Sequence, residues 1–278
     1  MSTFSSTDVL LWPHIVTRVL DAGARTALDP TRFGDVRWLD EVDSTNRYLL
    51  EEARGGAAEG LVAVADHQTA GRGRLGRTWT APPGASLLTS VLLRPRLPAA
   101  SLHLVTVAVA LAAADACAEL AGVAPGLKWP NDLVVGDRKL AGILAEADLG
   151  PPGGPVVVVG IGINVDWPAA LPPELADIAT ALNLSGGRPV ERSALLVGML
   201  VGLERRYSVL DRAEGREAVA SEYRRRCVTV GREVRVELSD ETFAGQAVDI
   251  SVEGHLLVST DACVREVSAG DVVHLRPA

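Results

Sequence analysis

Cysteine, aromatic residues and excess positive charge are all scarce in this 278-residue chain. Its three cysteines, Cys117, Cys227 and Cys263, are widely separated and form no Cys-x-x-Cys pair. This spacing indicates neither a disulfide framework nor a thiolate metal site. A formal net charge of -8 argues against general binding to nucleic acid or to anionic membranes.

Long apolar runs and targeting segments are also missing. The longest apolar stretch, Leu104 to Ala114, is much shorter than the roughly 20 residues that span a bilayer. No basic segment precedes an apolar one at the amino terminus, so no secretory signal is indicated. Together with the cysteine spacing, this predicts a cytoplasmic protein. The 47% hydrophobic content suits one large domain plus a small one.

Strand-like and helix-like segments alternate through the first three quarters of the chain. Strands are predicted over 36–43, 61–66, 86–94, 133–135, 140–147 and 156–165. Helices are predicted after Ser44, over the alanine-rich segment 101–120, and over 192–210 with its period close to 3.6. Pro-Pro-Gly-Gly at 151–154 predicts a hairpin-like turn. These segments indicate an α/β or α+β core.

The pattern changes near the carboxyl terminus. From Gly231 onward, apolar residues alternate with polar ones and turn residues recur, which predicts five short strands up to Leu275. Such closely spaced strands are typical of a small β-barrel. We place the boundary with the preceding domain near Val228.

Three short segments carry groups suited to binding anions. Gly-Arg-Gly-Arg-Leu-Gly-Arg occupies 71–77, Lys-Trp-Pro-Asn-Asp occupies 128–132, and Lys-Leu-Ala-Gly-Ile-Leu begins at Lys139. Lys139 is a cation on an otherwise apolar strand, so we expect an anionic group to hold it there. Arginine side chains and the backbone N–H groups of glycine-rich loops bind phosphate and carboxylate. Asp132 has the side-chain type that binds Mg²⁺.

Each segment taken alone has an ordinary structural explanation. Residues 71–77 alone would more often be a solvated loop or part of an arginine-glycine tail that binds nucleic acid. Residues 128–132 alone form a turn, and Lys139 alone can extend from a strand edge into solvent. The order and spacing of all three together favour a common site.

With Gly-Ile-Gly-Ile-Asn-Val at 160–165, the three segments resemble those of biotin protein ligases, the enzymes that adenylate biotin and attach it to a lysine. The resemblance extends from about Val36 to Leu275. It implies an α+β catalytic domain at 36–227, with a central mixed sheet and helices like those of class II aminoacyl-tRNA synthetases. It also implies an SH3-like β-barrel at 228–278. The preceding extension, 1–35, is too short for the winged helix of the family's repressors, so a monofunctional ligase without DNA binding is expected.

The resemblance also implies a role for each matching position. Biotin recognition is implied for Ser44, Thr45, Asn46, Gln68, Arg72, Gly142, Ile143 and Leu144. Contact with ATP or the adenylate is implied for Arg72, Gly73, Arg74, Arg77, Trp79, Asn131, Lys139 and Asn164. Lys139 and Arg74 are the implied catalytic residues, because cations stabilise charge that develops on phosphate oxygens. Asp132 is the candidate Mg²⁺ ligand, and the implied acceptor is a biotin carboxyl carrier domain of an acyl-CoA carboxylase.

Two other functions are compatible with parts of the sequence. A lipoate or octanoate ligase would share the fold and the chemistry, but residues 68–74 and the Lys-Trp-Pro-Asn-Asp segment fit biotin ligases better. A nucleic-acid-binding module could combine an arginine loop with a barrel. Only three arginines cluster in 71–77, however, and the net charge is negative, which disfavours that function.

Overall fold

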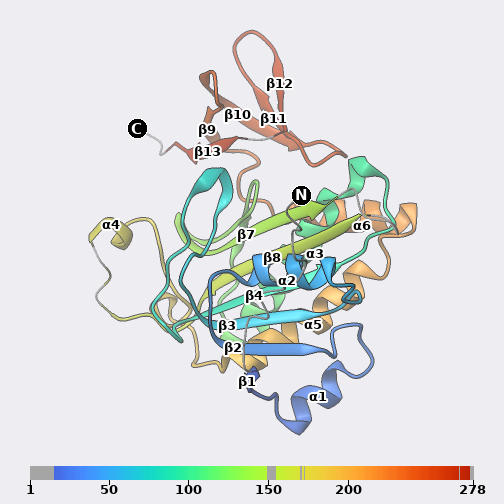
Figure 1. The fold of residues 1–278 in the computed structure, drawn as a ribbon. Helices are drawn as coiled ribbons and strands as arrows, with labels where there is room; N and C mark the ends of the chain where they lie inside the picture. Colours follow the sequence, from blue (N-terminus) through green and yellow to red (C-terminus); the bar gives the residue numbers. More distant parts are fainter. Residues whose placement is uncertain (1–15, 149–154, 170, 172, 269, 276–278) are drawn as a thin grey trace, which may run out of the picture.

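The computed structural model describes residues 16–148, 155–169, 171, 173–268 and 270–275, and the turn predicted at 151–154 lies outside this part of the chain. The described residues form two sheets (Figure 1). The larger has eight strands in the order β1-β2-β3-β4-β8-β7-β6-β5, and the smaller has five. The smaller sheet lies at one end of the molecule, above β7 (Arg138–Asp148).

The large sheet is mixed. Its strands are β1 (Val16–Arg18), β2 (Val36–Val42), β3 (Val62–Gln68), β4 (Ser86–Leu93), β5 (Gly126–Lys128), β6 (Asp132–Val135), β7 (Arg138–Asp148) and β8 (Val156–Asn164). Only β2 and β3 pair in parallel, and the other neighbours pair antiparallel. The central strands β4 and β8 are buried along their whole length. Their continuous apolar character follows from packing on both faces.

Helices cover both faces of this sheet. They are α1 (Ala22–Leu28), α2 (Thr45–Arg54), α3 (His103–Ala116), α4 (Pro173–Ala176), α5 (Arg192–Tyr207) and α6 (Ala213–Arg226). The α2 helix packs against β3, β4 and β8 on one face, while α3 and α5 cover the other (Figure 1). Asp115 of α3 binds Arg206 of α5 at 2.6 Å and Arg226 of α6 at 2.7 Å, which ties these three helices together.

The helical segment that contains α3 is long and apolar enough, by length and composition, to cross a membrane. It runs from Ala99 to Ala121 with a mean hydropathy of 1.8, longer than the apolar stretch apparent in the sequence. Its most apolar window is 67% buried within the fold. The apolar composition of this helix is that of a core helix packed between the sheet and α5 and α6.

Most predicted elements of the large domain are present, but two strands and three helices were missed. The first described strand is β1, so the expectation that Val36 begins the first strand is wrong; three residues give too short a pattern to recognise. The short β5 and the short helices α1 and α4 were also overlooked. The last omission is α6, which buries only Val219 and Tyr223 and therefore has almost no apolar periodicity.

The five predicted carboxy-terminal strands are confirmed. They are β9 (Glu233–Glu237), β10 (Thr242–Ile250), β11 (Leu256–Ser259), β12 (Val264–Val267) and β13 (Asp271–His274). They pair antiparallel in the order β12-β11-β10-β9-β13. Val234, Val236 and Val258 are fully buried in the interior of this small domain. The predicted fold class, an α+β domain followed by a small SH3-like domain, is confirmed.

The two sheets are joined by hydrogen bonds around Trp129. Val228 N donates to Leu127 O at 2.9 Å, and Trp129 Nε1 donates to Gly254 O at 2.9 Å. Trp129 N donates to Thr229 Oγ1 at 3.1 Å, and this oxygen lies 3.0 Å from His274 Nε2. The Lys-Trp-Pro-Asn-Asp segment is therefore attached directly to the small sheet.

Burial, together with the nearby charges of Lys128 and Arg232, lowers the pKa of His274 to about 4. In the unfolded chain a histidine titrates near 6.5, so between about pH 6.5 and 4 the unfolded state binds a proton that the folded state does not. Because of this difference, the free energy of unfolding is highest above about pH 6.5 and falls as the pH drops toward 4.

We expect the melting temperature to drop less between pH 7 and pH 5 in His274→Gln than in the wild type, as measured by calorimetry at both pH values. His67→Gln, which replaces a histidine of the large sheet, is the matched control. Equal pH dependence in the wild type and in His274→Gln would contradict this assignment.

Candidate active site

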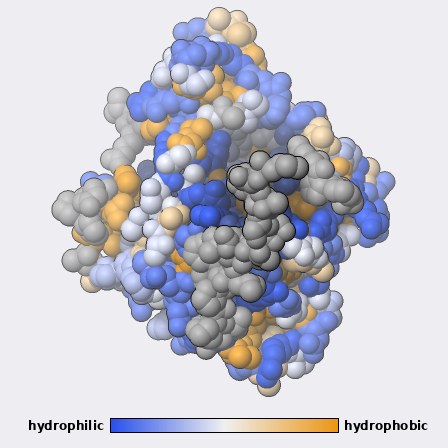
Figure 2. Space-filling model, viewed as in Figure 1, coloured by the Kyte–Doolittle hydropathy of each residue, from blue (hydrophilic) through white to orange (hydrophobic). Residues whose placement is uncertain are grey.

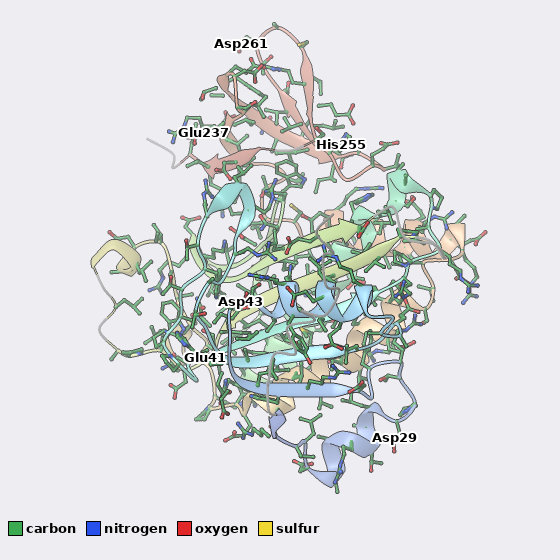
Figure 3. All side chains as sticks on the ribbon, in the orientation of Figure 1. Asp29, Glu41, Asp43, Glu237, His255 and Asp261 are labelled. Atoms are coloured by element: carbon green, nitrogen blue, oxygen red, sulfur yellow. The ribbon has the colours of Figure 1, made fainter. Side chains whose placement is uncertain are left out.

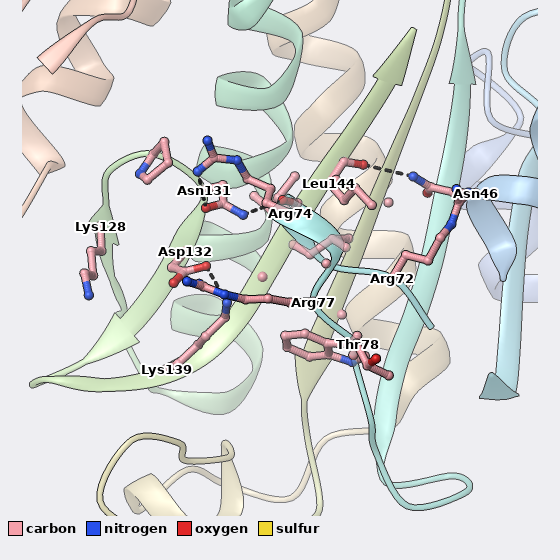
Figure 4. Close-up of a pocket in the computed structure, with 18 of the residues that line it drawn as sticks. Asn46, Arg72, Arg74, Arg77, Thr78, Lys128, Asn131, Asp132, Lys139 and Leu144 are labelled. Carbon is pink, nitrogen blue, oxygen red and sulfur yellow. Dashed lines mark hydrogen bonds and ion pairs between the residues drawn. The ribbon is translucent and has the colours of Figure 1, made fainter. Parts of the chain in front are cut away.

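A cavity of about 290 Å³ lies on the α2 face of the large sheet, where that sheet meets the small one. Strands β7 and β8 supply its floor, residues 71–79 and 128–132 supply its walls, and β9 and β13 reach it from the small sheet (Figure 4). In Figure 3, Glu237 is seen on the small sheet above this region. Hydrophilic residues predominate around the same region of the molecular surface (Figure 2).

The floor of the cavity is made of glycines on adjacent strands. A Cβ atom on Gly162 would lie 2.6 Å from Cε2 of Trp79, and one on Gly142 would lie 2.9 Å from the same indole. A Cβ atom on Gly160 would lie 2.1 Å from Asn46 Oδ1. These distances are shorter than van der Waals contact, so the indole and the amide can lie on the sheet only because side chains are missing there.

Buried polar residues form one end of the cavity. Ser44, Thr45 and Asn46, at the start of α2, are each 4% exposed. Thr45 N donates to Gln68 Oε1 at 2.8 Å, which leaves the Nε2 amino group as the donor that Gln68 can offer a ligand. Asn46 Nδ2 donates to Leu144 O at 3.1 Å. Helix α2 begins here because Ser44 has extended backbone angles, although its side chain makes no capping hydrogen bond.

The arginines of the 71–77 loop all point toward acceptors. Arg72 Nη2 donates to Glu146 Oε2 at 2.8 Å, and Arg74 Nη1 donates to Asn131 Oδ1 at 3.4 Å. Arg77 forms an ion pair with Asp271 of β13. The loop is thus connected to β7, to the 128–132 segment and to the small sheet, one arginine to each.

Lys139 has the anionic partner that its apolar surroundings predicted. Its Nζ lies 2.7 Å from Asp132 Oδ1, with Lys139 37% exposed, and 5.5 Å from the centroid of the Trp79 ring. Asn131 Nδ2 donates to Ile143 O at 2.7 Å, which fixes the segment that carries Asp132 onto β7. Lys128, which also lines the cavity, has its pKa lowered mainly by burial.

The charge of the cavity is opposite to that of the chain as a whole. Five basic and three acidic side chains line it: Arg72, Arg74, Arg77, Lys128, Lys139, Asp132, Glu237 and Asp271. The indole Nε1 of Trp79 is buried and has no hydrogen-bond partner among the described residues. A surplus of cations and a free donor, in a chain with net charge -8, suit an anionic ligand.

The structure brings together all but one of the predicted site residues. Those that line the cavity are Ser44, Thr45, Asn46, Gln68, Arg72, Gly73, Arg74, Arg77, Trp79, Asn131, Asp132, Lys139, Gly142, Ile143 and Leu144. Asn164 does not line it: this side chain is 2% exposed, and its Nδ2 donates to Thr180 O at 2.9 Å. Its predicted contact with adenine is therefore not supported, because both ends of its amide already have partners.

Several lining residues were missed in the sequence. Gly160 and Gly162 belong to a segment that the resemblance includes, but a strand glycine alone does not reveal that it forms a floor. Glu237 and Asp271 come from the small sheet, and nothing in their local sequence indicates proximity to residues 71–79. Lys128 belongs to the Lys-Trp-Pro-Asn-Asp segment, and this was the one signal in the sequence that it lines the cavity.

The glycine-floored cavity, with a polar cluster at one end and cations at the other, defines an enzyme that binds a small molecule with an anionic group. Residues 38–166 match the biotin/lipoate A/B protein ligase family, and residues 229–275 match the biotin protein ligase C-terminal domain. The biotin--[acetyl-CoA-carboxylase] ligase of Mycobacterium tuberculosis is 40% identical over 86% of this chain and 90% of its own length. The chain belongs to the biotin protein ligase family.

Other relatives are consistent with this assignment. The bifunctional ligase/repressor BirA of Bacillus subtilis is 33% identical over 84% of this chain and 72% of its own length. The structure of the Aquifex aeolicus biotin protein ligase in complex with biotin and ATP has a TM-score of 0.74 and 30% identity. It covers 88% of this chain and 100% of that protein. The resemblance found in the sequence is therefore confirmed.

The Arg77–Asp271 ion pair should restrain the 71–77 loop before any ligand binds. Half-exposed ion pairs contribute less than about 1 kcal/mol, so we expect Asp271→Asn to increase the rate of tryptic cleavage after Arg74 by roughly two- to fivefold. Asp240→Asn, in the turn after β9, is the matched control. Mass spectrometry of the early fragments measures the rate, and unchanged cleavage would show that the ion pair does not restrain the loop.

Proposed function

We propose that this chain is an ATP-dependent ligase that activates biotin to biotinyl-5′-AMP and transfers the biotinyl group to a lysine of a protein. The observation that carries the proposal is the arrangement of the cavity. A buried Ser-Thr-Asn-Gln cluster lies at one end with Arg72 beside it, a glycine floor lies in the middle, and Lys139 and Arg74 lie at the other end (Figure 4). Membership of the biotin protein ligase family supports it.

Each part of the cavity fits one part of biotin. The ureido head has N–H donors and a carbonyl acceptor, which match the hydroxyl of Thr45 and the amino group of Gln68. The apolar chain would lie over the sheet at Gly142 and Leu144. The carboxylate would then lie toward Arg74 and Lys139, and a guanidinium such as that of Arg74 can bind it with two hydrogen bonds. Arg72, which the resemblance assigns to the carboxylate, lies beside Asn46 in the free protein.

The cations at the other end serve the two chemical steps. In the first, a carboxylate oxygen of biotin attacks the α-phosphorus of ATP, a new C–O–P linkage forms, and pyrophosphate leaves. Two anions must approach each other, and Lys139 and Arg74 reduce their repulsion and stabilise charge on the phosphoryl oxygens. In the second, a neutral lysine amine attacks the acyl carbon, the acyl C–O bond breaks, and AMP leaves.

Asp132 has two roles in this scheme, as the partner of Lys139 and as a metal ligand. It holds Lys139 in the cavity until phosphate oxygens compete for the ammonium group. No cluster of three or more histidine, cysteine, aspartate or glutamate side chains among the described residues could hold a metal ion alone. Mg²⁺ commonly uses one or two carboxylates together with substrate phosphates. Asp132 therefore fits as the Mg²⁺ ligand, and the ion would supply neutralisation of the phosphate charge.

The remaining features of the proposal concern partner and compartment. The acceptor would be a biotin carboxyl carrier domain of an acyl-CoA carboxylase, as the name of the Mycobacterium tuberculosis relative suggests. The widely spaced cysteines, two of them buried and free, support action in the reducing cytoplasm. A lipoate or octanoate ligase is the alternative, and the polar cluster of 44–46 with Gln68 favours biotin because lipoate has no ureido group.

Thermal shift distinguishes biotin from lipoate. A ligand at 100 times its Kd stabilises the folded state by about 2.7 kcal/mol, which corresponds to roughly 5–10 °C for a chain of this size. We expect such a rise in melting temperature with biotin and little change with lipoate. A larger rise with lipoate would identify the chain as a lipoate ligase.

Lys139→Ala should abolish adenylate formation while the fold remains intact. Loss of a group that stabilises developing charge lowers the rate by at least about 10²-fold. Biotin-dependent exchange of pyrophosphate into ATP measures this step, and Arg138→Ala, an exposed neighbour on β7, is the matched control. Exchange at the wild-type rate in Lys139→Ala would remove Lys139 from the chemistry.

A further inference from the structure

Glu146 connects the polar cluster to the arginine loop through a single oxygen atom. Its Oε2 accepts a hydrogen bond from Asn46 Nδ2 at 2.8 Å and another from Arg72 Nη2 at 2.8 Å. The side chain belongs to β7, is 25% exposed and is not among the residues that line the cavity. No role was assigned to Glu146 from the sequence.

The first consequence concerns the orientation of the Asn46 amide. The amide atom assigned as Nδ2 faces two acceptors, Glu146 Oε2 and the carbonyl oxygen of Leu144. Only the NH₂ group can face two acceptors, because a flipped amide would place Oδ1 against a carboxylate and a carbonyl. The charge on Glu146 therefore turns Asn46 Oδ1 toward Ser90.

The second consequence passes through Ser90 to Thr45. Ser90 Oγ lies 2.6 Å from Asn46 Oδ1 and 2.7 Å from Thr45 Oγ1, and its hydroxyl has one hydrogen to donate. Asn46 Oδ1 can only accept, so the Ser90 hydrogen goes to it, and the Thr45 hydroxyl donates to Ser90 Oγ or to Gln68 Oε1, which lies 3.1 Å away. Thr45 Oγ1 is left with lone pairs alone for a ligand.

The result is a fixed pattern of hydrogen-bonding groups at the closed end of the cavity. Thr45 offers an acceptor, and Gln68 offers its amino group as a donor, since its Oε1 is occupied by Thr45 N. A cyclic urea presents the complementary pair, an N–H donor beside a carbonyl acceptor. The contacts of Thr45 Oγ1 with Ser90 and Gln68 hold this hydroxyl in place beside the amino group of Gln68.

We propose that Glu146 is a positioning residue for recognition of the ureido head group, acting through Asn46, Ser90 and Thr45. This inference rests on the proposed function, because it takes biotin as the ligand. The ion pair with Arg72 is a separate contact made by the same oxygen atom, and it can affect a ligand through the charge of Arg72. The two contacts predict different responses to an uncharged ligand, so they can be distinguished.

The test compares biotin with biotin methyl ester, which retains the ureido head and lacks the carboxylate. Glu146→Gln removes the charge, and an amide can pair with Asn46 in either orientation. We expect the variant to bind both probes about tenfold more weakly than the wild type does, the scale of a lost charge-assisted hydrogen bond. Its affinity for ATP should not change. Isothermal titration calorimetry measures all three affinities.

Three outcomes would overturn the inference. Unchanged affinity for both probes would show that Glu146 does not act on recognition. Weaker binding of biotin alone would show that it acts only through Arg72, and an equal loss of ATP affinity would show a general structural role. A wild-type chain that binds neither probe would overturn the proposed function, and the inference with it, which is a distinguishable result.

Two further variants keep the test decisive. Glu146→Ala removes both hydrogen bonds and should weaken both probes at least as much as Glu146→Gln does, so it replaces that variant if the latter melts early. Asp148→Asn neutralises another carboxylate of β7, two residues along and outside the cavity, and should bind both probes with wild-type affinity.

Discussion

The absence of side chains at three positions of the central sheet is the constraint on which the site depends. Gly142, Gly160 and Gly162 lie on neighbouring strands, and any Cβ atom there would overlap Trp79 or Asn46. The glycines thereby create the depth of the cavity and let both flanking groups rest on the backbone. Because a sheet interior normally disfavours glycine, its repeated use at this one place marks where a ligand or a ring must approach the strands closely.

A second principle is that three of the five cations of the site are paired with acids before any ligand binds. Arg72 is paired with Glu146, Arg77 with Asp271, and Lys139 with Asp132. Each pair contributes less than about 1 kcal/mol, because the cations are partly exposed. A phosphate or carboxylate of the ligand can then exchange with an acid that is already present. The cavity still has a surplus of cations, which favours an anionic ligand.

The small sheet belongs to this arrangement and is more than an appendage. Asp271 pairs with the loop, Glu237 lines the cavity, and Trp129 anchors the 128–132 segment to Gly254. The segment that carries Asp132 is thus held from two sides, by β7 through Asn131 and by the small sheet through Trp129. Movement of the small sheet would therefore be transmitted to the partner of Lys139.

The sequence by itself determined the order of most strands and helices, the five-stranded end domain and nearly all of the cavity, because apolar periodicity and the three anion-binding segments are local patterns. It failed for β1, β5, α1, α4 and α6, which are too short or too polar to show such a pattern. It also misplaced Asn164, whose amide is occupied within the core. Only the tertiary structure decided that Asp271 and Glu146 meet the arginine loop and that Glu237 lines the cavity, since contacts between distant segments depend on how the sheets pack. The direction of each hydrogen bond around Asn46 was decided there too, because it depends on which acceptors the fold brings beside that amide.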